Sequence, residues 1–200
     1  SGMNISGGNI TLGGSSITAN NGGLNINSTG SINISNSLAS LTTASFNSST
    51  GITMAGLTAN GAVNLNSGIG STTITGALST NNNTLSITAS DLSLTGSINT
   101  GTSATALNVT NSGALGLGFS SGFSGMNVSN SELALITGDL NLINGSITAA
   151  TGTSVSLTGK LVIGANGGSI TGQGSMTLAS TKGLAVDSSI NTTGNLSLEG

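Results

Sequence analysis

The sequence repeats a short pattern in which two apolar residues flank one small polar residue. The stretch from Thr84 to Asn99 holds two such triplets, 85–87 (LSI) and 92–94 (LSL), followed by a single apolar residue, Ile98. These apolar positions lie about seven residues apart, which is too short for a helix between them. Alternation with a period of two is typical of a short strand that buries one face. The stretch is therefore predicted to be one coil of a solenoid built from three short strands.

Similar apolar positions recur along the whole chain and sort onto three faces. The first face is predicted to hold residues 3–5, 24–26, 46, 63–65, 85–87, 107–109, 126–128, 147, 170 and 190. The second face is predicted to hold residues 10–12, 32–34, 52–54, 74, 92–94, 115–117, 133–135, 155–157, 176–178 and 196–198. The third face is predicted to hold residues 17, 38 with 41, 57, 78, 98, 119 or 123, 140–142, 161–163 and 184–186. This spacing gives between nine and ten coils of about 21 residues each.

We therefore predict an all-β fold, a right-handed parallel β-helix, with residues 1–200 forming a single β-solenoid segment. Stacking like strands about 4.8 Å apart completes their hydrogen-bond ladders and lines the interior with rows of Ile, Leu and Val. Right-handed winding is expected because the gaps between triplets are uneven and parallel crossovers are right-handed as a rule. Both ends stop within the repeat pattern, so we expect an internal slice of a longer repeat protein.

Small residues fall between the triplets, where the chain must bend. The Asn-Gly pairs at 21–22, 60–61, 144–145 and 166–167 are predicted to supply bends with positive φ. One segment, 113–125 (GALGLGFSSGFSG), departs from the pattern. We expect a local bulge there, with Phe119 and Phe123 filling the interior, and the alternative is a small exposed apolar contact patch.

The composition excludes several classes of protein. Charged residues make up 4 % of the chain, against about 25 % in an average globular protein, and the net charge is -3. Disorder is disfavoured because the chain is rich in β-branched residues and carries little net charge. The charges are too few for a nucleic-acid surface or a polybasic membrane anchor, and no apolar run is long enough to insert into a membrane. A chain without Cys has no disulfide framework.

The sequence contains few residues of the types that act in catalysis. There is no His or Cys, and the charged residues are Asp91, Glu132, Asp139, Lys160, Lys182, Asp187 and Glu199. A carboxylate pair is conceivable at Glu132 and Asp139, which are seven residues apart. The others are scattered over different coils, so we predict no enzyme activity and no catalytic, cofactor-binding or metal-binding residues. Asn-x-Ser/Thr sequons such as Asn4-Ile5-Ser6 leave glycosylation as an open alternative.

The coils resemble those of a known family of surface proteins. Runs such as 8–12 (GNITL), 30–34 (GSINI), 61–65 (GAVNL) and 138–142 (GDLNL) look like the repeats of filamentous-haemagglutinin-like exoproteins. These are large adhesins that Gram-negative bacteria secrete by a two-partner system, and the passenger domains of autotransporters are similar. The resemblance covers essentially the whole chain. It implies an extracellular or cell-surface β-helix that passes through an outer-membrane secretion pore during export.

The predicted function is a structural stalk or rod segment of a large secreted bacterial adhesin, without chemistry of its own. Contact with a host or neighbouring cell is expected through other parts of the polypeptide. The first alternative is a subunit of a self-assembling extracellular filament or sheath, because open terminal coils favour head-to-tail association. A minor alternative is an ice-binding solenoid, since the second face carries a mixed row of outward Thr, Ser and Asn.

Overall fold

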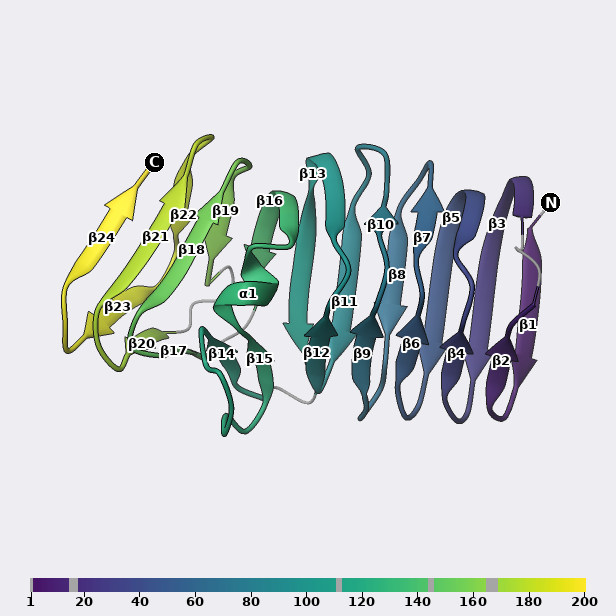
Figure 1. The fold of residues 1–200 in the computed structure, drawn as a ribbon, viewed down its shortest axis with the longest axis horizontal. Coiled ribbons are helices and arrows are strands. Elements are labelled where there is room, and N and C mark those ends of the chain that lie inside the picture. Colours follow the sequence, from purple (N-terminus) through teal and green to yellow (C-terminus); the bar gives the residue numbers. More distant parts are fainter. Residues whose placement is uncertain (1, 15–17, 111–112, 144–145, 165–168) are drawn as a thin grey trace.

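The computed structural model describes residues 2–14, 18–110, 113–143, 146–164 and 169–200. The chain forms an all-β solenoid of about nine turns, with coils of about 20 residues stacked in parallel along one axis (Figure 1). This confirms the predicted β-helix and its coil length. The predicted bends at 144–145 and 166–167 and the apolar position 17 lie outside the described residues.

The first face runs the length of the rod and belongs to an 11-stranded sheet. Its strands are β1 (Met3–Gly7), β3 (Thr18–Ser28), β5 (Leu38–Ser48), β8 (Val63–Asn66), β11 (Leu85–Ala89), β13 (Ile98–Val109), β16 (Ile136–Leu142), β19 (Leu161–Ile163) and β22 (Leu184–Val186). The same sheet includes β7 (Leu57–Ala59) and β10 (Leu78–Ser79) on the third face, because β3, β5, β13 and β16 continue around the corner between the two faces.

The second face is divided into two sheets of five strands each. The N-terminal sheet contains β2 (Ile10–Leu12), β4 (Ile32–Ile34), β6 (Ile52–Met54), β9 (Ser71–Ile74) and β12 (Asp91–Leu94). The C-terminal sheet contains, in spatial order, β15 (Met126–Val128), β14 (Leu115–Leu117), β17 (Ser146–Ala149), β20 (Ser169–Gly172) and β23 (Ser189–Thr192). The C-terminal part of the third face is a sheet of three strands, β18 (Thr153–Leu157), β21 (Met176–Ser180) and β24 (Leu196–Glu199).

The predicted assignment of strands to faces is correct up to residue 109 and wrong for most strands beyond it. Residues 140–142, 161–163 and 184–186 lie on the first face, because β16 pairs with β13. The strands at 126–128, 147–149 and 169–172 form the sheet of the second face, and 153–157 and 176–180 the sheet of the third. The cause is one extra strand, since β14 and β15 both lie on the second face. Residues 133–135, predicted on the second face, instead form the end of a short helix, α1 (Asn130–Leu133), and the turn that follows it.

The core consists of rows of aliphatic side chains that follow the axis of the solenoid. On the second face, Ile32, Ile52 and Leu92 are each at most 2 % exposed, and the ladder places them in one row with Thr72. On the first face, Phe46 is fully buried in the row between Ile26 and Leu65. Strands such as β4, β6, β11 and β18 bury alternate residues, as the triplet pattern predicts. The rows are uncovered at the last coil, where Leu198, which pairs with the buried Leu178, is 49 % exposed.

Buried hydroxyls close the corners of the coils. Ser48 Oγ donates to the carbonyl of Gly51, three residues on, at 2.8 Å, and also lies 2.7 Å from the carbonyl of Gly30 in the preceding coil. Ser180 Oγ makes the equivalent contacts with the carbonyls of Gly183 and Gly159 near the other end of the rod. Each hydroxyl thus contacts carbonyl groups of two successive coils where the chain turns, so a buried polar residue stabilises the corner.

Glycine is required at several corners because successive coils approach closely. A Cβ on Gly96 would lie 2.0 Å from the carbonyl oxygen of Gly76, and one on Gly159 would lie 2.0 Å from that of Gly138. The same reason explains Gly61, where a Cβ would lie 1.8 Å from the carbonyl oxygen of Thr42. Gly61 does not adopt positive φ, so the prediction of a positive-φ bend at Asn60-Gly61 is wrong. Asn81 and Asn82 are the non-glycine residues with positive φ among those described.

Candidate functional site: a polar seam on the second face

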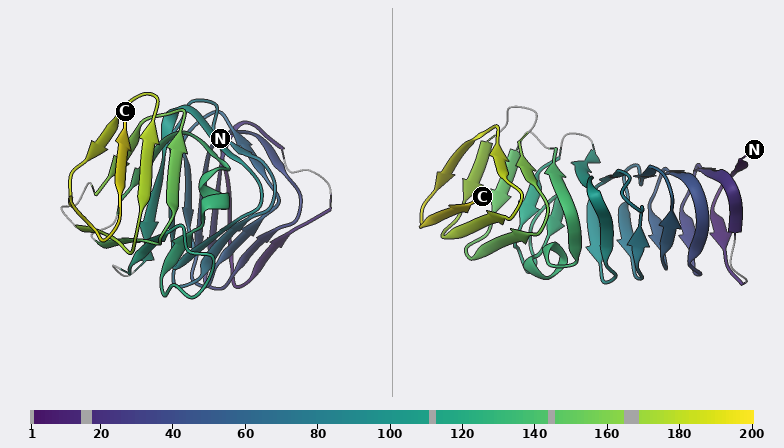
Figure 2. Two further views of the ribbon diagram at one scale, coloured as in Figure 1. Left: turned by 60° about the vertical axis from the view of Figure 1, so that its left-hand side comes forward. Right: turned by 90° about the horizontal axis from the view of Figure 1, so that it is seen from above.

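The second face has a seam where its two sheets meet. The backbone ladder of the N-terminal sheet ends at β12, and the next strand along the axis, β15, contacts β12 without joining its ladder. Figure 1 shows this junction at the middle of the rod, beside α1. Seen from a second direction in Figure 2, the C-terminal coils lean away from the line of the N-terminal coils. The seam is therefore a break in the second face, and the third face has another, where β18 contacts β16 without joining its ladder.

Glu132 supplies the hydrogen-bond acceptor that β12 lacks at the seam. In an ordinary coil the inward strand residue donates to the next coil, as Ile32 N–H does to the carbonyl of Gly51 at 3.0 Å. At the seam, Leu94 N–H donates instead to Glu132 Oε1 at 2.9 Å. A side-chain carboxylate thus takes the place of a backbone carbonyl, and a hydrogen bond to a charged group is stronger than one to a neutral group.

The same carboxylate fixes the helix that carries it. Glu132 Oε2 accepts the N–H of Ser129 at 2.9 Å and its hydroxyl at 2.8 Å, while Glu132 N–H donates to Ser129 Oγ at 3.3 Å. This reciprocal arrangement is a capping box at the start of α1. The sequence carries its signature, a Ser followed three residues later by Glu, which is the signal that would have identified Glu132 as a structural residue.

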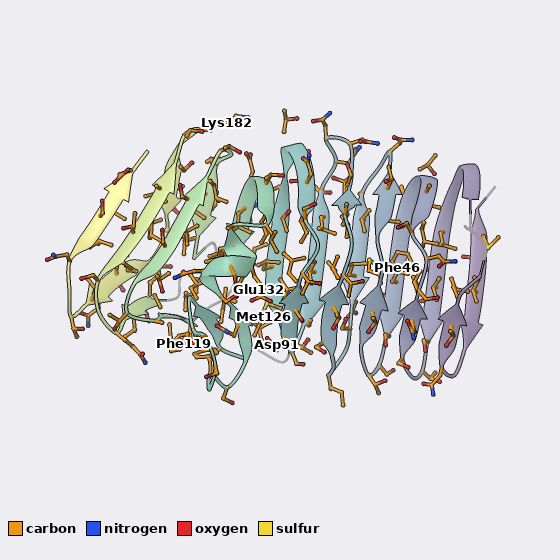
Figure 3. The ribbon with its side chains drawn as sticks, in the orientation of Figure 1. Phe46, Asp91, Phe119, Met126, Glu132 and Lys182 are labelled. Carbon is orange, nitrogen blue, oxygen red and sulfur yellow. The ribbon has the colours of Figure 1, made fainter. Side chains whose placement is uncertain are left out.

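Asp91 makes the second bridge across the seam. Its Oδ1 accepts the backbone N–H of Asn127 in β15 at 2.9 Å. Asp91 is exposed and is the first residue of β12. Figure 3 shows Asp91, Met126 and Glu132 gathered at the junction, with Phe119 near them. Two carboxylates from elements far apart in sequence therefore hold neighbouring sheets together.

A polar hollow of about 400 Å³ opens along the seam. Its lining comprises Asp91, Leu92, Ser93, Leu94, Thr95, Ser120, Asn127, Ser129, Ser131 and Glu132. The hydroxyl of Ser129 lies 2.9 Å from that of Ser131, and the amide nitrogen of Asn127 donates to the carbonyl of Phe119 at 2.7 Å. These polar groups of the lining therefore have their hydrogen-bond partners mainly within the hollow and its rim.

The conceivable carboxylate pair at Glu132 and Asp139 is used in two separate contacts. Asp139 lies in β16, and its Oδ1 accepts Lys160 N–H from the adjacent coil at 2.7 Å. The carboxylate that shares a hollow with Glu132 is Asp91. Groups of three or more His, Cys, Asp or Glu residues able to hold a metal ion are not found within the described ranges.

The two Phe residues of segment 113–125 cover the outside of the sheet beside the seam. Their ring centroids are 4.8 Å apart, and both side chains are half-buried. Phe123 packs on Gly116 of β14, where a Cβ would lie 2.6 Å from a ring carbon. The prediction that these rings fill the interior is wrong, because the connection between the parallel strands β14 and β15 returns over the outer face of β14. Gly116 makes room for this return.

The rest of the outer surface presents amides and hydroxyls in register. Asn25 Nδ2 donates to Asn4 Oδ1 at 3.2 Å, and Asn47 Nδ2 donates to Asn27 Oδ1 at 3.0 Å. Two shallow hollows, of about 450 and 650 Å³, lie over this part of the first face. The second face carries an outward row formed by Thr11, Asn33, Thr53, Thr73 and Ser93.

Comparison with models of protein families, with curated proteins and with solved structures finds no match for this chain. Among the described residues, no helix is long and apolar enough to cross a membrane.

Proposed function

We propose that this chain is a segment of the stalk of a large secreted bacterial surface adhesin. The observation that carries the proposal is the uninterrupted ladder of the first face, in which every coil from β1 to β22 pairs with the next. Such a ladder makes a stiff rod of about 40 Å from nine coils. A rod of this kind keeps the parts of the polypeptide at its two ends apart, which is the function of a stalk.

The outer surface supports an extracellular role. Amides and hydroxyls cover it, and the few charges are Asp91 and six others along 200 residues. Amide pairs such as Asn25 with Asn4 run along the axis and satisfy one another between coils. The resemblance of the coil sequences to filamentous-haemagglutinin-like repeats supports the same proposal. Partners on a host or neighbouring cell are assigned to other parts of the polypeptide.

The decisive experiment is the length of the native polypeptide, measured by mass spectrometry of the denatured protein, with electron microscopy of the intact molecule. A stalk segment is expected to lie within a much longer chain that shows further coils on both sides of residues 1–200. A polypeptide that ends near these residues and remains monomeric contradicts the proposal.

A filament or sheath subunit is the second candidate, in which a second copy would continue the stack of coils. Met3 is 46 % exposed on β1, and Leu196 and Leu198 are 37 % and 49 % exposed on β24. A stalk would cover them with further coils of the same chain, whereas a filament would cover them with a second copy. Sedimentation of the isolated native protein distinguishes the two, because only the filament subunit is expected to form concentration-dependent polymers.

Ice binding remains a third proposal with one supporting observation, the outward hydroxyl row of the second face. Four of its five members are Thr or Ser, and the ladder holds them in register. Thermal hysteresis of the purified chain is the test, and its absence removes this candidate.

A further inference from the structure

We propose that the seam between β12 and β15 is a joint, which divides the rod into two blocks of coils that open separately. The N-terminal block extends from β1 to β12 and the C-terminal block from β14 to β24, while β13 pairs with strands of both blocks. The carboxylates of Asp91 and Glu132 form the hydrogen bonds that hold this joint closed, and we call these two residues its latches. Its use as a compliant joint in a stalk rests on the proposed function, whereas the existence of two blocks does not.

The first argument is the number of backbone hydrogen bonds that cross between coils. In a solenoid each coil is stabilised mainly by its two neighbours, so the weakest interface between coils is where the array separates. Every other neighbouring pair of strands on the second face is joined by a backbone ladder, for example β9 to β12 over four residues. At the seam the described hydrogen bonds of β12 are two side-chain bridges, one from Asp91 to β15 and one from Leu94 N–H to Glu132 of α1.

The second argument is the register across the seam. Paired residues of neighbouring coils on the first face are 19 to 23 residues apart in the regular part of the chain. Across the seam, Thr105 pairs with Leu140, 35 residues on, and Ile98 pairs with Ile136, 38 residues on. The first and third faces are thus continuous here but irregular, so the joint bends without separating the rod.

The third argument is the position of unsatisfied polar atoms. Among the described residues, the buried side-chain oxygens without a hydrogen-bond partner are those of Thr105, Thr110 and Asn127. All three belong to the coil that contains the seam. An unsatisfied buried polar group destabilises the folded state, so the cost of imperfect packing is concentrated in this coil.

Amide hydrogen exchange of the whole chain, followed by NMR at increasing denaturant concentration, tests the proposal. We expect the amides of β4, β6 and β9 to lose protection at a different denaturant concentration from those of β18 and β21. Within the native state, Leu94 N–H and Asn127 N–H are expected to exchange at least about tenfold faster than the ladder amide Thr95 N–H, which donates to Ile74 at 3.0 Å. A single transition for all these amides, with no faster exchange at the seam, overturns the proposal.

Two variants test the latches. Glu132→Gln replaces one carboxylate oxygen by an amide donor that faces N–H groups, and Asp91→Ala removes the acceptor of Asn127 N–H. Each is expected to raise exchange at its own partner amide about tenfold or more and to leave the amides of β6 unchanged. Glu199→Gln, at an exposed carboxylate that accepts the hydroxyl of Ser197 at 3.0 Å, is the matched control and is expected to change neither. Unchanged exchange at Leu94 and Asn127 in both variants contradicts the assignment of the latches.

This outcome is independent of the stalk proposal. Two blocks found in a short polypeptide would support the joint and contradict the stalk. A single block within a long polypeptide would do the reverse.

Discussion

The coils before and after the seam differ in how the chain passes from the third face to the first. In the N-terminal coils, β3 and β5 are single strands of 11 residues that run around the corner from the third face to the first. After β16 the strands of these two faces are separate, as β7 and β8 are in the N-terminal block, and the third face becomes a sheet of its own, β18, β21 and β24. Coil length is nevertheless similar on both sides, with partner residues 19 to 23 apart.

The difference shows which features define a coil and which can vary. Ser48 in the N-terminal block and Ser180 in the C-terminal block make the same pair of buried contacts. Gly96 and Gly159 permit the same close approach of coils. Corner hydroxyls and corner glycines are therefore common to both blocks, whereas strand length and sheet membership are not.

The largest expected effect separates an interior coil from the terminal one. Phe46→Ala removes a fully buried ring and is expected to lower the free energy of unfolding of the N-terminal block by about 4 kcal/mol. Leu184→Ala, at a half-buried position of β22, is expected to cost only about 1 kcal/mol. Denaturant unfolding followed by circular dichroism measures both. Equal losses would mean that the terminal coil is as well packed as the interior.

The second prediction concerns the corner glycines. Gly96→Ala and Gly159→Ala each place a Cβ 2.0 Å from a carbonyl oxygen and are expected to destabilise their blocks by similar amounts, about 2 kcal/mol. Gly8→Ala, where a Cβ meets nothing within 4 Å, is the control and is expected to lie within about 0.5 kcal/mol of the wild type. A clear inequality between Gly96 and Gly159 would show that the close approach of coils has a different cost at the two corners, which lie between the second and third faces and between the third and first faces.

The third prediction tests the corner hydroxyls. Ser48→Ala and Ser180→Ala each remove a buried hydroxyl that contacts the carbonyls of two successive coils, and each is expected to cost about 1 to 2 kcal/mol in thermal or denaturant unfolding. The matched control is Ser156→Ala, at an exposed position of β18, for which we expect no measurable change. A cost at Ser48 alone would restrict the corner device to the N-terminal block.

The smallest effect is expected on the outer surface. Asn25→Ala removes the amide that donates to Asn4 at 3.2 Å in an exposed position, and we expect a loss of about 0.5 kcal/mol or less. Because the change is small, it is best measured as a shift of the denaturant midpoint against Asn4→Ala, which breaks the same bond from the other side. A loss as large as that at Ser48 would mean that the amide rows contribute to stability as much as the corners do.

The sequence predicts the solenoid well because each triplet states which side chains are buried. In the stretch from Thr84 to Asn99, the triplets 85–87 and 92–94 and the residue Ile98 all lie on strands whose apolar members are buried. The assignment fails after residue 109 because triplets are alike on every face. A single inserted strand therefore shifts all later faces, and no local pattern reveals the shift.

The corner hydroxyls carry a sequence signal that triplet reading overlooks. In 26–28 (INS), 46–48 (FNS), 98–100 (INT) and 178–180 (LAS), a Ser or Thr takes the inward position that follows an apolar residue. These hydroxyl residues are buried, at 0 to 6 % exposed. The bridges of Asp91 and Glu132 are different, because they depend on a contact between residues 36 and 38 positions apart that no repeat specifies.

The constant interval between paired residues of the second face has a consequence for the evolution of the gene. Residues 32, 52, 72 and 92 follow one another in the ladder at intervals of 20. A tandem duplication or deletion of one such interval returns the chain to the same phase, so the neighbouring coils meet the same partners as before. Unequal recombination within this region can therefore lengthen or shorten the rod in whole coils, and natural variants are expected to differ in length before they differ in architecture.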